Sequence, residues 1–347
     1  MLIESCDKAC SGTNLNHLKI KHLINSGGCR MTKVYKVGVI GLGAIGERLI
    51  QSFGQYPRTE VVAVCDHVKE RVESMQKKLG GINGYSSHLD MLNGEKLDIV
   101  YVAVPPKYHH SIALDVMSKG IHILCEKPLA NSLEEALEMK NIAQEAGIVH
   151  AMNFPLNYSS GANAFAKRIK ENYIGRLRRV ELTMKFPGWP RYWQQNDWIA
   201  SKEQGGFVLE VGVHFIQQAQ RIFGSLKYKD GQLEFPEDPT KSEIGVFATI
   251  ELEDGTPFII NGISEVAGEE RIAFTAYGTE GTLSLVNWGT LEGGKLLEPI
   301  AEIATDDVVP SSLLENIVKA LNGEEANVYD FNAGYEAQVI LEKLRGK

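Results

Sequence analysis

A glycine pattern near the start of the chain constrains its fold more than any other feature. The stretch VGVIGLGAIGERLI places Gly41, Gly43 and Gly46 directly after a strand-like run and at the start of a helical pattern. At such a turn the first glycine allows a tight bend, the second lets the backbone approach a pyrophosphate, and the third lets helix and strand pack closely. The stretch therefore predicts a dinucleotide site, with phosphates bound by the exposed amides at the helix start, Ala44 and Ile45.

An acidic residue at the end of the next strand-like run strengthens this prediction. The run TEVVAVCD ends in Asp66, about 20 residues after Gly46, where the acid that binds the adenosine ribose belongs. The alternative is a glycine-rich turn followed by a solvated aspartate. A carboxylate at this place accepts hydrogen bonds from the 2′-hydroxyl and repels a 2′-phosphate, so we expect NAD rather than NADP. Lys69 and Arg71 follow closely in sequence and weaken that preference.

The chain changes its rhythm at about residue 153. Before it, five strand-like runs alternate with helical patterns, one of which opens on a Ser132 cap and closes at Gly147. Alternation of this kind predicts a Rossmann-type parallel sheet over residues 33–153. After it, consecutive strand-like runs from Glu243 to Trp288 predict an α+β domain over residues 154–347 with an open-faced, largely antiparallel sheet.

Length and composition limit the class of protein. A chain of 347 residues suggests two domains. The net charge of −8 argues against a broad nucleic-acid surface, and no apolar run approaches the roughly 20 residues of a membrane span. Cys65 and Cys125 lie in apolar runs, so the five cysteines suggest a reducing cytoplasm rather than a disulfide framework.

Residues 1–32 differ from the rest of the chain. They show little periodicity and lack a secretory apolar core, so we expect an extension outside the folded core, the alternative being a targeting or regulatory arm. Three cysteines lie here, but Cys6 and Cys10 have an unusual spacing and no histidine pair nearby, so no metal site is expected.

The stretch GIHILCEKPLA places Glu126, Lys127 and Pro128 at the carboxyl end of a predicted sheet strand. Ligands of open α/β sheets bind at that edge, and a lysine there can stabilise an alkoxide or carbonyl oxygen by its charge. The other interpretation is a surface Glu-Lys pair before a proline turn.

The stretch VLEVGVHFIQ places Glu210, His214 and Gln217 at a spacing that puts them on one face of a helix. That face is either the solvated side of the helix or one that directs an acid/base histidine at a substrate. Spacing alone favours the solvated side.

An aromatic stretch, GWPRYWQQNDW, lies between these two motifs in sequence. Aromatic rings such as Trp189 suit the apolar faces of sugars, and Arg191 is able to bind a carboxylate or phosphate. An aromatic plug in an interdomain or subunit contact fits equally well.

These motifs occur in the order and at the distances of one known family. The stretches GVIGLGAIG, VPPKYHHSIALDVMSKGIHILCEKPLA and QGGFVLEVGVHFIQ together resemble the Gfo/Idh/MocA (glucose–fructose oxidoreductase / inositol dehydrogenase) family, from Lys33 to nearly the end. The resemblance implies a nucleotide-binding domain, a second domain whose open sheet often forms an oligomer interface, and NAD(P)-dependent hydride transfer at a sugar or cyclitol carbon.

The resemblance also implies particular residues. His214 matches the catalytic histidine and Lys127 the lysine of the Glu-Lys-Pro signature, whose lysine–proline bond is commonly cis. Glu210 stands where aspartate is usual, Gln217 where a second aspartate is common, and Pro106 where asparagine is usual. The implied catalytic residues are Lys127, His214 and Glu210. The implied cofactor-binding residues are Gly41, Gly43, Ala44, Ile45, Gly46, Asp66, Val104, Pro105, His109, Glu126 and Lys127. The implied substrate-binding residues are Lys127, Asn153, Trp189, Arg191, Glu210 and His214.

Two functions of different classes follow. The first is an NAD-dependent dehydrogenase of a sugar, sugar derivative or polyol, in which Lys127 and His214 assist proton transfer. Such an enzyme is expected to be cytoplasmic and to form a homo-oligomer through its second sheet. The second is a nucleotide-binding regulator or scaffold that kept the fold and lost turnover, which the departures at Glu210 and Gln217 motivate.

Overall fold

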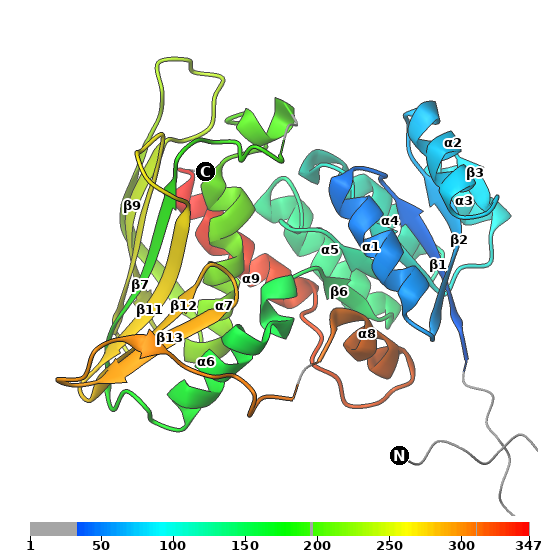
Figure 1. The fold of residues 1–347 in the computed structure, drawn as a ribbon. Coiled ribbons are helices and arrows are strands. Elements are labelled where there is room, and N and C mark those ends of the chain that lie inside the picture. The colour runs from blue at the N-terminus through cyan, green and yellow to red at the C-terminus, as the bar shows by residue number, and fades with distance from the viewer. Residues whose placement is uncertain (1–32, 195–196, 310, 347) are drawn as a thin grey trace, which may run out of the picture. The chain divides into compact units, whose positions relative to one another are not determined.

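Six parallel strands form the first of two sheets in the computed structural model, which describes residues 33–194, 197–309 and 311–346. Their order across the sheet is β3-β2-β1-β4-β5-β6 (Figure 1). The strands are β1 (Tyr35–Ile40), β2 (Thr59–Cys65), β3 (Asn83–Tyr85), β4 (Ile99–Val102), β5 (His122–Cys125) and β6 (His150–Met152). The predicted parallel sheet is confirmed, because every pairing within it is parallel. The sequence did not predict β3, whose three residues form no β-branched run.

Both faces of this sheet are buried. Successive residues of β4 alternate between two hydrophobic clusters, with Val100 and Val102 in one and Ile99 and Tyr101 in the other. A strand buried on both faces is apolar along its whole length, as β4 is. The helices that follow its strands are α1 (Ala44–Gln55), α2 (Lys69–Lys78), α3 (His88–Gly94), α4 (His109–Ser118) and α5 (Leu133–Ala146), with the 3-10 turn η1 (Pro106–Tyr108) before α4.

Helix α5 begins and ends where the sequence predicts. The Ser132 hydroxyl accepts a hydrogen bond from the Glu135 amide, and Gly147 closes the helix with a left-handed φ of 63°.

Eight strands form the second sheet, in the order β14-β13-β12-β11-β7-β10-β9-β8. They are β7 (Leu177–Phe186), β8 (Leu226–Glu234), β9 (Gly245–Leu252), β10 (Pro257–Ser264), β11 (Arg271–Gly278), β12 (Gly281–Val286), β13 (Thr290–Lys295) and β14 (Ala301–Glu302). All pairs are antiparallel except β10 with β7, so the predicted largely antiparallel sheet is confirmed. Strands β8, β13 and β14 lacked a clear sequence signal because they are polar, glycine-rich or very short.

One face of the second sheet carries helices and the other is open. In β9 and β10 alternate residues are buried, while Phe247 and Ile263 on the opposite face are 58% and 39% exposed. Figure 1 shows α6 (Ser160–Lys170), α7 (Val213–Phe223) and α9 (Phe331–Leu344) on the same side of this sheet. Of the described helices, these three supply the apolar cover that the buried face needs.

The C-terminal segment returns to the first sheet. Leu313, Leu314 and Ile317 of α8 (Leu313–Leu321) belong to the cluster around Val37 and Val39. Helix α9 contacts α5 and β6 as well as α7 and β8. Helix α9 therefore links the two sheets, α8 packs on the first, and the domain boundaries expected from the sequence stay a prediction.

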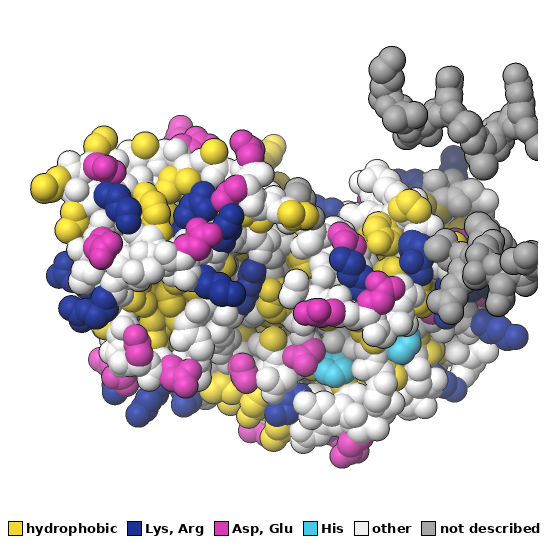
Figure 2. All heavy atoms as spheres, turned by 90° about the horizontal axis from the view of Figure 1, so that it is seen from below, with side chains coloured by type: hydrophobic (Ala, Val, Ile, Leu, Met, Phe, Trp, Pro, Cys, Tyr) yellow, Lys and Arg dark blue, Asp and Glu magenta, His cyan; other side chains and the backbone are white. Residues whose placement is uncertain are grey.

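Four further expectations from the sequence can be compared with the residues that the structure describes. The extension over residues 1–32, with Cys6 and Cys10, lies outside them. Within them, no helix is long and apolar enough to cross a membrane. The described residues also contain no group of three or more His, Cys, Asp or Glu side chains that could hold a metal ion. On the face shown in Figure 2, basic and acidic side chains are interspersed and form no continuous basic surface.

Candidate active site

The glycine turn has the geometry that a bound pyrophosphate requires. Gly41 leaves β1 with a φ of 99°, and a Cβ there would lie 2.5 Å from the Ala103 carbonyl oxygen. A Cβ on Gly46 would lie 2.1 Å from the Gly41 oxygen, so α1 packs directly on the turn. Gly43, in contrast, faces open space, and as N-cap of α1 it offers no side-chain cap to the first amides. Free amides and open space at one helix N-terminus fit a dinucleotide phosphate.

Asp66, which follows β2, is held beside the glycine turn by two backbone hydrogen bonds. Its Oδ2 accepts a hydrogen bond from the Leu42 amide at 2.8 Å, and its Oδ1 accepts one from the Val68 amide at 2.9 Å. A carboxylate has about four acceptor positions, so capacity for ribose hydroxyls remains. The Arg71 guanidinium lies 3.6 Å away on the partly exposed side, and Lys69 instead pairs with Glu73.

His109 ties together the turns that follow β4 and β5. Its ring is fully buried, with Nδ1 2.8 Å from the Pro128 oxygen and Nε2 2.8 Å from the Val104 oxygen. Burial, the largest cause, lowers the pKa of this histidine. The side chain thus braces the backbone around Val104 and Pro105, and its cofactor contact stays a prediction.

The Glu126-Lys127-Pro128 turn follows β5 at the carboxyl edge of the parallel sheet, and its Lys127–Pro128 bond is cis. The buried Glu126 carboxylate accepts hydrogen bonds from the Tyr101 hydroxyl and, at 2.5 Å, from the Asn153 amide. Burial raises the pKa of Glu126. The sequence did not indicate Tyr101, since a tyrosine within an apolar strand has no distinguishing signal.

Lys127 and Glu210 meet across 83 residues of sequence. The Lys127 Nζ lies 3.1 Å from Glu210 Oε2 and donates to the Glu210 backbone oxygen at 3.2 Å. The two side chains are only 10% and 9% exposed. Glu210 belongs to a π-helical turn, η4 (Val208–Gly212), that runs directly into α7. The sequence predicted an ordinary helix here; such wider turns are frequent at functional sites.

His214 lies in the first turn of α7. The rings of Phe154 and Trp288 lie nearly perpendicular to its ring, at centroid distances of 5.9 and 5.3 Å. Burial, together with the charges of Lys127 and Arg191, lowers the pKa of His214 well below its usual value, so the ring is neutral at pH 7. Within the described part of the chain, its Nδ1 is buried without a hydrogen-bond partner.

The polar stripe of VLEVGVHFIQ is therefore not solvated. His214 and Gln217 are buried, and the Gln217 Oε1 accepts a hydrogen bond from the Asn157 amide at 2.6 Å. Arg221 extends this buried network by binding Asn157 and Asn163. The interpretation of the stripe as the wet side of a helix is wrong, because η2 (Pro155–Tyr158) and α6 cover it.

Two residues of the aromatic stretch, Trp189 and Arg191, pack within the chain, whereas Tyr192 and Trp193 are 93% and 56% exposed. The Arg191 guanidinium binds both carboxylate oxygens of Glu270 at 2.8–3.1 Å and stacks on Phe186 and Trp189. The Trp189 ring nitrogen donates to the Ile199 oxygen, in the turn η3 (Asp197–Ala200). This arrangement shows Trp189 and Arg191 packed within the chain; their substrate contacts, and an interdomain or subunit contact of the stretch, both stay predictions.

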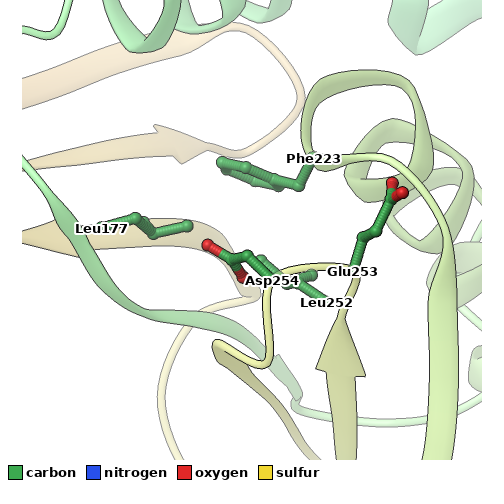
Figure 3. Close-up of a pocket in the computed structure, with 5 residues that line it drawn as sticks. All are labelled: Leu177, Phe223, Leu252, Glu253 and Asp254. Atoms are coloured by element: carbon green, nitrogen blue, oxygen red, sulfur yellow. The ribbon is translucent and has the colours of Figure 1, made fainter.

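An open depression of about 270 Å³ lies elsewhere, at the far end of α7. Figure 3 shows the side chains that line it, which are Leu177, Phe223, Leu252, Glu253 and Asp254. Phe223 is the last residue of α7 and His214 the second, so the two are roughly 13 Å apart along the helix axis. The depression is separate from the Lys127–Glu210 pair.

Gly41, Gly46 and Asp66 on a sheet of this order define a dinucleotide-binding Rossmann protein. Two family models match the chain: an oxidoreductase family with an NAD-binding Rossmann fold (Gfo/Idh/MocA) over residues 35–154, and the Gfo/Idh/MocA C-terminal domain over residues 163–284. Together they span more than half of the chain, which belongs to the Gfo/Idh/MocA oxidoreductase family.

Individual relatives of known name are similar over most of the chain. D-glucoside 3-dehydrogenase of Escherichia coli (strain K12) is 24% identical over 89% of this chain and 94% of its own length. The WlbA dehydrogenase of Bordetella pertussis, solved with NADH and UDP-GlcNAcA, has a TM-score of 0.76 at 21% identity, covering 90% of this chain and 95% of that one. The 3-ketoreductase KijD10 of Actinomadura kijaniata, solved with NADP and TDP-benzene, has a TM-score of 0.78 at 20% identity, covering 90% and 98%.

Proposed function

We propose that this chain is an NAD-dependent oxidoreductase that transfers hydride at a hydroxyl or carbonyl carbon of a sugar, sugar derivative or cyclitol. The observation that carries the proposal is the buried Lys127–Glu210 pair at the carboxyl end of β5, together with the buried His214, on which the Lys127 charge acts. Ligands of open parallel sheets bind at that edge. The names of relatives, which include D-glucoside 3-dehydrogenase and myo-inositol 2-dehydrogenase, support the substrate class.

Each of the three residues has a distinct part in the proposed reaction. A bound nicotinamide supplies or accepts the hydride. His214, neutral because burial lowers its pKa, is the group that accepts the hydroxyl proton during oxidation. The Lys127 ammonium stabilises negative charge on the substrate oxygen in a site shielded from water. Glu210 holds that ammonium in place from 3.1 Å.

The cofactor contacts follow from the turns already described. Gly43 and the first amides of α1, those of Ala44 and Ile45, face the open space that fits the pyrophosphate. Asp66 favours NAD, since its carboxylate accepts from ribose and opposes a 2′-phosphate, while the nearby Arg71 limits the preference. The backbone at Val104 and Pro105 and the carboxylate of Glu126 complete the proposed nicotinamide side.

Assembly and location are part of the same proposal. The open face of the second sheet, with Phe247 and Ile263 exposed, supports a homo-oligomer formed through that sheet. Cys65 and Cys125 are buried and free, which supports a reducing cytoplasm.

A reduced-nicotinamide absorbance assay across sugars, inositols and sugar phosphates tests the proposal. We expect NAD-dependent turnover with at least one member of the panel. Tight NAD binding without turnover on any member would instead favour the non-catalytic regulator that the unusual Glu210 and Gln217 suggest.

A further inference from the structure

The backbone that leads into the π-helical turn is sharply bent. Gly206 has a φ of 101°, its amide donates to the Ile199 oxygen at 3.0 Å, and its own oxygen accepts from the Glu210 amide at 2.8 Å. The position of Glu210, and hence of its carboxylate beside Lys127, therefore depends on how this bend is held.

A carboxylate from a distant part of the chain holds it. Glu243, which precedes β9 and is 3% exposed, accepts a hydrogen bond from the Val208 amide at 2.8 Å. Val208 is the first residue of the π-helical turn, and no side chain from the preceding residue, Phe207, caps it. Glu243 thus supplies the missing cap from another element.

Gly206 is shaped to receive this carboxylate. A Cβ at Gly206 would lie 2.1 Å from Glu243 Oε2 and 2.5 Å from Oε1. Any side chain at that place would displace the carboxylate from the Val208 amide. The hydrogen bond from the Val208 amide to Glu243 therefore requires glycine at position 206.

A cation holds the preceding part of the same segment. The Arg345 guanidinium, just after α9, donates to the Lys202 oxygen at 2.7 Å and to the Glu203 oxygen at 3.0 Å. Its charge acts on Glu243, and the charges of Glu243 and Glu342 act on Arg345 in turn. The buried Glu243 and the partly buried Arg345 thus anchor residues 202–208 from opposite ends.

We propose that Glu243 is a positioning residue, whose carboxylate fixes the start of the π-helical turn and thereby places Glu210 against Lys127. The expected effect of Glu243 on turnover rests on the proposed function, whereas its expected effect on the backbone of the turn does not. Glu243 touches neither Lys127 nor Glu210 in any described contact, so its role is exerted through the Val208 amide.

Three variants separate positioning from general stability. Glu243→Ala removes the acceptor, whereas Glu243→Gln keeps an oxygen that can accept from Val208. Asn316→Ala is the matched control, because Asn316 is also buried and accepts from a distant backbone amide, that of Asn327 at 2.9 Å, but lies in α8. Melting temperature shows that each variant is folded.

The first measurement is independent of activity. Hydrogen exchange of a peptide covering residues 206–212 should become several-fold faster in Glu243→Ala, stay near the original rate in Glu243→Gln, and not change in Asn316→Ala. Unchanged exchange in a folded Glu243→Ala protein would overturn the proposal, whatever the protein's activity.

The second measurement is kcat with the best substrate of the panel, beside the Kd for NAD. An ångström-scale displacement in an active site costs up to about 100-fold, so we expect kcat to fall about 10- to 100-fold in Glu243→Ala with Kd unchanged. Glu243→Gln should recover most of kcat, and Asn316→Ala should keep it. Equal losses in the Ala and Gln variants would overturn the acceptor role, whereas absent turnover in the unmodified protein would refute only the proposed function.

Discussion

Replacing Lys127 by Met should destabilise the protein as well as stop the reaction. The Lys127 ammonium and the Glu210 carboxylate lie 3.1 Å apart and are both about nine-tenths buried. Removing one partner of a buried ion pair leaves the other charge uncompensated, which typically costs about 3–5 kcal/mol. Lys127→Met should therefore lower the free energy of unfolding by roughly that amount.

The double variant Lys127→Met with Glu210→Leu should recover most of this loss. Both charges are then absent, and the main remaining deficit is the Glu210 backbone oxygen, which loses its 3.2 Å hydrogen bond. One such bond is worth about 1 kcal/mol. The double variant should thus be more stable than Lys127→Met alone, although neither should turn over substrate.

Thermal unfolding at fixed protein concentration measures the difference. For a chain of 347 residues, an unfolding entropy of about 2.1 cal/mol/K per residue converts 3–5 kcal/mol into a melting temperature roughly 4–7 °C lower. If Lys127→Met melts no lower than the double variant, Lys127 and Glu210 do not compensate each other as a buried ion pair.

Three further predictions concern the cofactor, pH and assembly. NAD should bind more tightly than NADP, and Asp66→Asn should narrow the gap in titrations; equal affinities in the unmodified protein would show that Arg71 outweighs the acid. Burial raises the pKa of Glu243 to about 7, so between about pH 4.5 and 7 the unfolded chain releases a proton that the folded chain keeps, and stability falls with rising pH. In chemical unfolding, the free energy of unfolding of Glu243→Gln, relative to that of the unmodified protein, should rise by about 3 kcal/mol between pH 4.5 and 7. A difference that stays constant with pH would contradict the raised pKa of Glu243. Light scattering should show an oligomer that Phe247→Asp weakens, while a monomer before mutation would exclude the open sheet as an interface.

The features that sequence predicted best are those fixed by local backbone requirements. Gly41, Gly43 and Gly46 are recognisable because a strand-to-helix turn against a pyrophosphate tolerates little else. The Ser132 cap and the Gly147 terminus were likewise predictable, since each depends on neighbours a few residues away.

The features that sequence did not reveal depend on distant partners. Lys127 and Glu210 stood out separately, but nothing in either motif showed that they pair. Arg191 has the chemistry to bind a carboxylate and does so within the chain, through Glu270, 79 residues away. The Glu243 contact with Val208 gives no periodic signal at all, and the π-helical turn it caps has no spacing that distinguishes it from an α-helix in advance.

We propose that His214 accepts the proton of a sugar or cyclitol hydroxyl and that Lys127 stabilises the negative charge left on its oxygen. The most direct test is NAD-dependent turnover of the panel by the unmodified protein and by His214→Ala, beside the Kd of each for NAD. A positioned acid/base contributes roughly 10²–10⁴ in rate, so we expect turnover to fall on the order of a hundredfold or more in His214→Ala while the Kd hardly changes. Full turnover by His214→Ala on the true substrate would contradict the acid/base role of His214.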